Sequence, residues 1–323
     1  MPLFDIDAAE LPHYRPEVAE PADFDAFWAR TLAETRAHDL AVEAVPVDAH
    51  LSVIEAYDLT FSGFGGHRVK GWYLRPAGRA DEQLPAVVEY IGYGGGRGFA
   101  HSRLTWAAAG YAYVVMDTRG QGTAPTNGFG ATPDPAGAGV AAPGTLTRGI
   151  EDPHDHYYRR VYTDGVRAVE AVRELPGVDP ARVAVTGVSQ GGAITTAVAG
   201  LVDVAAAMPD VPWLSHIRRG VELAPAGPFA EVRTYLSAHR HRVEDAFRTL
   251  SYVDGVNHAR RAQAPALYSV ALMDPVCPPS TVYAAANAWG GEVDIEVYPF
   301  NEHEGGTEFQ RERQLGWLAE RLG

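Results

Sequence analysis

Short apolar runs alternate with longer amphipathic stretches along most of the chain. The apolar runs are bounded by Gly, Pro or charged residues, as the buried strands of a parallel sheet often are. They cover residues 86–91, 111–117, 182–187, 265–274 and 293–300. Strands that alternate with helices in this way predict the α/β class, with a mostly parallel central sheet flanked by helices.

Helical spacing of apolar residues marks three long stretches, of which residues 157–175 give the clearest pattern. Residues 21–38 and 307–322 give the other two. In the last stretch, the side chains expected to face inward are Phe309, Leu315, Leu318 and Leu322. Two further strand-like runs, 53–59 and 69–75, are joined by a glycine-rich segment and predict an antiparallel hairpin at the sheet edge.

Three segments stand apart from this alternation. Residues 1–40 are interpreted as an N-terminal extension whose helix docks on the main body. Residues 131–144 are mostly Gly, Pro and Ala and predict a long surface loop, with a lid or pocket rim as the sharper interpretation. Residues from about 208 to 250 predict an insertion over the carboxyl edge of the sheet, near the active site. We interpret residues 1–323 as a single domain.

Charge and composition narrow the possible partners. The 27 basic and 41 acidic residues give a net charge of −14, which argues against nucleic acid and anionic membranes as partners. Cys277 is the only cysteine, so an intrachain disulfide is impossible. The first residues lack the basic and apolar regions of a signal peptide, and no apolar run is long enough to span a bilayer. These observations predict a cytoplasmic protein.

Candidate chemistry centres on Gly187-Val188-Ser189-Gln190-Gly191, which follows a predicted strand and precedes a small-residue helix. This is the strand–turn–helix context of a nucleophile elbow, where glycines two positions either side of the serine allow a tight turn. The pattern alone is also common in flexible turns. Its flanking elements favour Ser189 as the nucleophile of a serine hydrolase.

A serine hydroxyl needs an adjacent base, and the usual chain order in this fold is Ser, then Asp or Glu, then His. Asp274 ends one predicted strand, and His303 lies in the loop after the last one. The carboxyl ends of parallel strands meet at one edge, so both residues are expected beside Ser189. His303 would act as general base and acid, and Asp274 would orient it. Alternatively, Asp274 starts a turn and His303 is an ordinary loop histidine.

Two backbone N–H groups are needed to stabilise the oxyanion. One is expected from Gln190, directly after the nucleophile, and the other from Tyr93 in the glycine-rich loop 92–98. The same loop could be read as a phosphate cradle, but it lacks the Lys-Ser/Thr pair of a P-loop.

Several ordered motifs together resemble carbohydrate esterase family seven, the acetyl xylan esterases and cephalosporin C deacetylases of the α/β-hydrolase superfamily. The matching motifs are Arg119-Gly120-Gln121-Gly122, Gly187-Val188-Ser189-Gln190-Gly191, Asp254-Gly255-Val256-Asn257, Cys277-Pro278-Pro279 and His303-Glu304-Gly305-Gly306. The resemblance implies an α/β-hydrolase fold with no metal and no cofactor. It also implies removal of acetyl groups from acetylated sugars, xylo-oligosaccharides or antibiotic esters of the cephalosporin C type.

The resemblance further implies the triad Ser189, Asp274 and His303, and a ring-shaped homo-hexamer whose active sites face an inner cavity. Near the site, Arg119, Gln121 and Glu304 are expected to brace loops rather than to touch the substrate. The chain departs from the family pattern at Gly94, where an Asn is usual, and at Pro275, where a polar residue is common. Both departures bear on substrate preference more than on the chemistry.

Three other interpretations remain. The pairs His154/His156 and His239/His241 suggest a metal site, but residues two apart on a helix do not face one another, and a third ligand is not evident. A serine hydrolase of another class would be a short-chain esterase of a secondary metabolite, a peptidase or a lipase, although a long apolar lid helix is missing from the pattern. A non-catalytic binding module on the same fold would have no need of Ser189.

Overall fold

The computed structural model describes residues 4–123, 128–136 and 144–323 of the chain. In this part of the chain nine strands form one sheet in the order β1-β2-β3-β5-β4-β6-β7-β8-β9. The strands are β1 Glu43–Val47, β2 Ile54–Ser62, β3 Arg68–Pro76, β4 Leu84–Tyr90, β5 Ala112–Met116, β6 Val178–Val188, β7 Ala206–Asp210, β8 Ala266–Ala271 and β9 Val293–Tyr298. β1, β2 and β3 pair antiparallel, β3 pairs antiparallel with β5, and the pairs from β5 to β9 are parallel.

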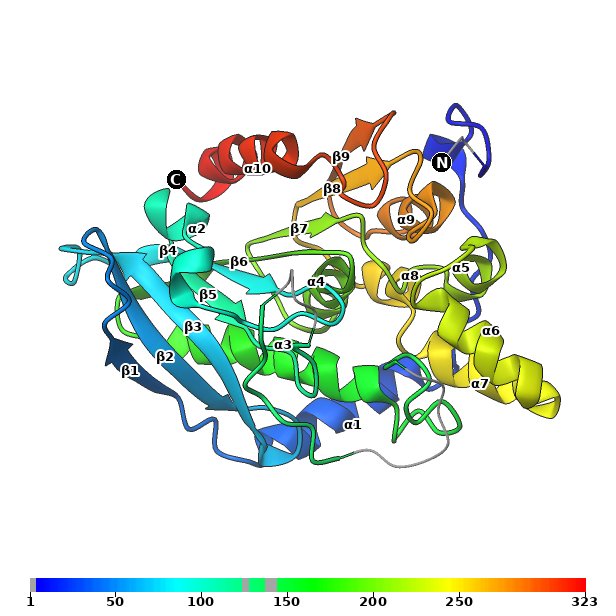
Figure 1. Cartoon of the computed structure of the whole chain (residues 1–323), viewed down its shortest axis with the longest axis horizontal. Coiled ribbons are helices and arrows are strands. Elements are labelled where there is room, and N and C mark those ends of the chain that lie inside the picture. The colour runs from blue at the N-terminus through cyan, green and yellow to red at the C-terminus, as the bar shows by residue number, and fades with distance from the viewer. Residues whose placement is uncertain (1–3, 124–127, 137–143) are drawn as a thin grey trace.

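Helices cover both faces of this sheet, as Figure 1 shows. They are α1 Phe24–Arg36, α2 Thr105–Ala108, α3 Tyr157–Glu174, α4 Gln190–Leu201, α5 Ile217–Leu223, α6 Phe229–Ala238, α7 Val243–Ser251, α8 Gly255–Ala259, α9 Pro279–Ala286 and α10 Thr307–Leu322. Successive side chains of β4 enter different cores: Ala86 and Val88 pack with α1, α3 and α4, whereas Val87 packs with α2 and α10. This alternation is why the strand is apolar throughout.

These elements confirm the predicted α/β-hydrolase class, but two strands were missed. β1 lies outside the predicted hairpin and forms the true edge of the sheet. It has no buried residue, so its sequence carries no apolar alternation. β7 is fully buried, and it includes Met208 and Asp210, which had been assigned to the insertion. The segment between β7 and β8 therefore starts later than about 208, and its helices are α5 to α8.

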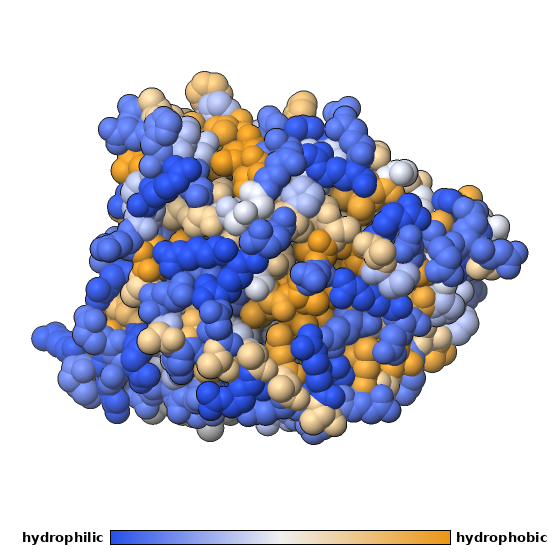
Figure 2. Space-filling view, turned by 180° about the vertical axis from the view of Figure 1, so that it is seen from behind, coloured by the Kyte–Doolittle hydropathy of each residue, from blue (hydrophilic) through white to orange (hydrophobic). Residues whose placement is uncertain are grey.

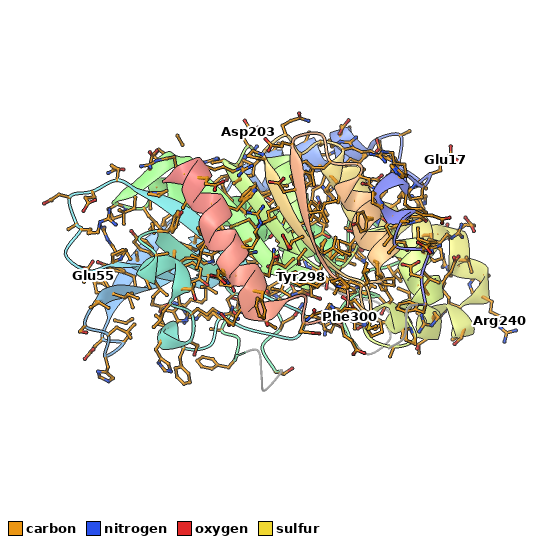
Figure 3. The ribbon with its side chains drawn as sticks, turned by 90° about the horizontal axis from the view of Figure 1, so that it is seen from above. Glu17, Glu55, Asp203, Arg240, Tyr298 and Phe300 are labelled. Atoms are coloured by element: carbon orange, nitrogen blue, oxygen red, sulfur yellow. The ribbon has the colours of Figure 1, made fainter. Side chains whose placement is uncertain are left out.

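The closing helix α10 lies across one face of the sheet, with Tyr298 against its N-terminal end (Figure 3). Leu318 and Leu322 are buried as predicted, but Phe309 is 77% exposed. The inward position one residue along is taken by Gln310, and Gln314 is also buried. Both glutamine side chains donate hydrogen bonds to the buried carboxylate of Asp210, which explains why a polar stripe faces the core.

The N-terminal helix α1 is attached to the rest of the molecule by aromatic contacts. The indole N–H of Trp28 donates to the carbonyl of Tyr252 over 3.0 Å, and the ring of Phe27 lies 4.5 Å from that of Tyr252.

Residues 131–136 form neither helix nor strand, and the rest of the predicted loop, 137–143, lies outside the described residues. Among the helices described, none is long and apolar enough to cross a membrane.

Candidate active site

Ser189 occupies a sharp turn between β6 and α4. Its backbone adopts φ 58° and ψ −113°, a strained conformation for a residue with a side chain. The residue is 8% exposed and caps the N-terminus of α4, where the helix dipole favours negative charge. The predicted elbow geometry is therefore present.

The two glycines of the motif are required by close backbone approach. A Cβ atom added to Gly191 would lie 2.1 Å from the carbonyl oxygen of Tyr90 in β4. One added to Gly187 would lie 2.5 Å from the carbonyl carbon of Gly191. Real carbon atoms do not approach so closely, so the turn can form only with glycine at both positions.

His303 lies after β9 and joins Ser189 to Asp274. Its Nε2 is 2.9 Å from Ser189 Oγ, and its Nδ1 is 2.8 Å from Asp274 Oδ2. Because a carboxylate only accepts hydrogen bonds, Nδ1 carries the proton and Nε2 is left to accept from the serine hydroxyl. The structure thus brings the three predicted residues together in the arrangement that a general base needs.

Asp274 is fully buried, and backbone donors hold it in place. Its Oδ1 accepts hydrogen bonds from the backbone N–H groups of Val276, at 2.7 Å, and Cys277, at 2.9 Å. β8 ends at Ala271, so Asp274 lies in the turn after the strand and not at its end as predicted. The turn suits a carboxylate that bonds the backbone two and three residues further on.

Gln121 links the two predicted oxyanion donors, of which Tyr93 lies in the loop 92–98 and Gln190 begins α4. The N–H of Gln190 is the first of α4 and has no acceptor within the helix. The side-chain oxygen of Gln121 accepts from the backbone N–H of Gly94, next to Tyr93, at 2.6 Å. Its side-chain nitrogen lies 2.8 Å from Gln190 Oε1 and 3.0 Å from the hydroxyl of Tyr157. Gln121 therefore ties the loop of one proposed donor to the side chain of the other.

Glu231, on α6, was not identified from the sequence. The hydroxyl of Tyr93 donates to its Oε1, and the backbone N–H of Leu146 donates to its Oε2 at 2.9 Å. The backbone N–H of Thr145 donates to the same tyrosine hydroxyl. Burial raises the pKa of Glu231, and burial together with the hydrogen bond to Glu231 raises the pKa of Tyr93 to about 12. Glu231 sits in an irregular Arg- and His-rich stretch, where nothing in the pattern singled it out.

Arg119 and Glu304 bond to neighbouring protein groups. Arg119 is fully buried and makes two hydrogen bonds with Asp164, at 2.5 and 2.7 Å, while Asp134 lies 3.3 Å away. Glu304 is exposed and accepts from the side chain of Asn301 and from a backbone N–H within its own loop. These contacts are with protein groups, and the bracing role of both residues stays a prediction.

A pocket of about 520 Å³ opens beside the predicted nucleophile and base. Tyr93, Pro228 and Val276 give it apolar surface, and Glu89 and Arg103 give it polar surface. Arg103 and Glu89 form an ion pair, and a quarter of the Arg103 side chain stays exposed. Gly227 and Pro228 precede α6, so the segment between β7 and β8 does contribute to the pocket wall.

Among the described residues, one group of three combines side chains that could ligate a metal ion: Asp274, Cys277 and His303. Two of these residues are already hydrogen-bonded to each other. The pairs His154/His156 and His239/His241, which the sequence suggested, are in no such group within that part of the chain.

Comparison with known proteins gives concordant matches. The family model for acetyl xylan esterase matches residues 1–321. The acetyl esterase Axe7A of Xylanibacter ruminicola is 28% identical over 95% of this chain and 69% of its own length. The structure of an acetyl xylan esterase from Paenibacillus sp. R4 superimposes with a TM-score of 0.92 and 37% identity, over 98% of this chain and all of that one. The structure of acetyl xylan esterase 1 from Thermoanaerobacterium sp. JW/SL YS485 superimposes with a TM-score of 0.91 and 33% identity, over 99% of this chain and all of that one.

Proposed function

The chain belongs to the acetyl xylan esterase family and is a carboxylic ester hydrolase, and from this premise we propose that it removes acetyl groups from short acetylated sugars through Ser189. The observation that carries the proposal is the continuous hydrogen-bond chain from Ser189 Oγ through His303 to Asp274. In this mechanism Asp274 positions His303, and His303 takes the proton of Ser189 as the hydroxyl attacks the ester carbonyl.

The attack places negative charge on the former carbonyl oxygen. We assign its stabilisation to the backbone N–H groups of Tyr93 and Gln190, each such donor contributing about 3 kcal/mol to the transition state. His303 then donates its proton to the leaving sugar oxygen, and acetyl stays on Ser189. A water molecule, deprotonated by His303, releases acetate by the same steps in reverse. No step requires a metal or a cofactor.

The pocket supports a short acyl group and a polar alcohol. Tyr93, Pro228 and Val276 offer apolar contacts of the kind that an acetyl methyl group makes. The exposed part of Arg103 offers N–H donors, which suit the hydroxyl groups of a sugar. A cephalosporin C-type ester shares the acetyl group, so its deacetylation belongs to the same proposal.

The test is a turnover comparison of acetylated xylobiose, glucose pentaacetate and cephalosporin C, with p-nitrophenyl esters of increasing chain length beside them. We expect the acetylated sugar to be preferred and the rate to fall steeply beyond acetyl. Preference for octanoyl esters, or cleavage of peptides alone, would refute the proposal in favour of another serine hydrolase. Ser189→Ala should abolish turnover without changing the melting temperature, and an active variant would exclude Ser189 as the nucleophile.

We also propose a cytoplasmic homo-hexamer. Two exposed phenylalanines, Phe300 at 85% and Phe309 at 77%, provide apolar surface for contacts between subunits. Apolar patches separated by polar ones also occupy the face shown in Figure 2. The single cysteine suits a reducing compartment. Light scattering after size exclusion tests the assembly: a monomer would refute it, and Phe309→Glu should weaken a hexamer held through this surface.

A further inference from the structure

The buried thiol of Cys277 lies beside the proposed triad and has no role in the mechanism. Asp274, Cys277 and His303 each present one ligand atom, and these atoms lie within 4.8 Å of one another. Asp274 and Cys277 are at most 1% exposed, whereas a third of the His303 side chain is exposed. A cation could therefore reach the cluster from solvent only past His303, because the other two side chains are buried.

We propose that this cluster is an inhibitory site for a thiophilic divalent cation such as Zn²⁺. A thiolate, an imidazole and a carboxylate form a ligand set that Zn²⁺ favours and Mg²⁺ does not. The thiolate and carboxylate together neutralise the dication, which a buried site requires. The strongly negative chain would also attract cations to its surface.

The geometry needs only a small closure. A tetrahedral zinc ion, with bonds of about 2.0 Å to nitrogen and about 2.3 Å to sulfur, holds such ligand atoms about 3.5 Å apart. The widest pair of ligand atoms would then close by roughly 1.3 Å at most, starting from the 4.8 Å limit. Asp274 Oδ2 and His303 Nδ1, which lie 2.8 Å apart, would move apart if the ion bound that nitrogen. The thiol proton leaves to solvent as the sulfur–metal bond forms, and a water molecule completes the coordination.

Metal binding and catalysis exclude each other at this site. An ion on Nε2 of His303 takes the lone pair that accepts the Ser189 proton, and an ion on Nδ1 breaks the hydrogen bond to Asp274. Either mode removes the general base. The inference builds on the proposed role of His303, but metal binding itself can be measured without turnover.

The experiment titrates Zn²⁺, Cd²⁺ and Mg²⁺ into the purified full chain with p-nitrophenyl acetate as substrate. We expect inhibition by Zn²⁺ and Cd²⁺, its reversal by EDTA, and no effect of Mg²⁺ at the same concentrations. In Cys277→Ser and Cys277→Ala the inhibition constant, measured against each variant's own rate, should rise by about tenfold or more. His241→Gln, which alters an exposed histidine, serves as the matched control and should be inhibited like the parent.

A second readout separates this proposal from the proposed function. Cd²⁺ should give a thiolate charge-transfer band with one ion per chain in the parent and in inactive Ser189→Ala, and no band in Cys277→Ala. Equal inhibition of the parent and both Cys277 variants would overturn the proposal, as would absence of the band. Failure of the acetyl-sugar assay alone would leave it standing, because the band does not depend on turnover.

Discussion

Glu231→Gln tests whether the insertion helix α6 positions the proposed oxyanion loop. The Glu231 carboxylate accepts from the Tyr93 hydroxyl and from the backbone N–H of Leu146, one donor on each oxygen. An amide has one oxygen, so in either orientation its NH₂ group faces a donor. The Tyr93 hydroxyl cannot turn to a free acceptor easily, because it already accepts from the N–H of Thr145. One half-buried donor is thus left unsatisfied.

An unsatisfied donor of this kind costs about 1–3 kcal/mol. If the strain moves Tyr93 N–H away from the substrate oxygen, kcat should fall by about 10- to 100-fold, since each 1.4 kcal/mol is a factor of ten. KM should change little, because the lost contact forms mainly in the transition state. Tyr93→Phe keeps the backbone N–H of Tyr93 but removes the hydroxyl that anchors the loop to Glu231, so its kcat should fall by a similar factor. In the double variant, kcat should fall by less than the product of the two single-variant factors, because both changes remove the same hydrogen bond.

The assay measures kcat and KM for p-nitrophenyl acetate together with urea unfolding for each variant. Glu222→Gln, on the exposed surface of α5, removes the same charge from the same insertion and is the matched control. A Glu231→Gln enzyme with parental kcat and lowered stability would show that the bond supports the fold only. If both kcat and stability stay at their parental values, the hydrogen bonds of Glu231 support neither the oxyanion loop nor the fold.

Three further predictions concern the same region. Gly191→Ala should destabilise the fold by about 3 kcal/mol or more, since its Cβ would meet the Tyr90 carbonyl, and a parental urea midpoint would contradict this. Asp274→Asn should lower kcat about 10⁴-fold at unchanged stability, because an amide no longer enforces the required tautomer of His303; a loss below tenfold would speak against its role. Burial raises the pKa of Asp210 to about 6, so between roughly pH 4 and 7 the folded state keeps a proton that the unfolded chain releases. The free energy of unfolding should therefore fall by about 3 kcal/mol over this range, and urea unfolding of Asp210→Asn should not show this pH dependence.

The features that could be predicted from the sequence are those with local signals. The elbow at Ser189 can be predicted because a strand, a glycine-flanked turn and a helix follow one another within a few residues. Asp274 and His303 follow strands, and the carboxyl ends of parallel strands share one edge, so chain order alone places them near the nucleophile. β1 was missed because an exposed edge strand needs no apolar face. β7 was missed because its residues, Ala206–Asp210, include a proline and lack β-branched side chains.

The features that could not be predicted depend on partners far away along the chain. The inward face of α10 was misassigned because Gln310 and Gln314 are polar, and their burial makes sense only once Asp210 is known to lie beneath them. Glu231 is 138 residues from Tyr93, and no spacing rule connects the two. Burial of a polar group is stable only when each donor finds an acceptor, so such pairs are decided by the folded structure as a whole. The residues that support the proposed chemistry are for this reason harder to predict than those that perform it.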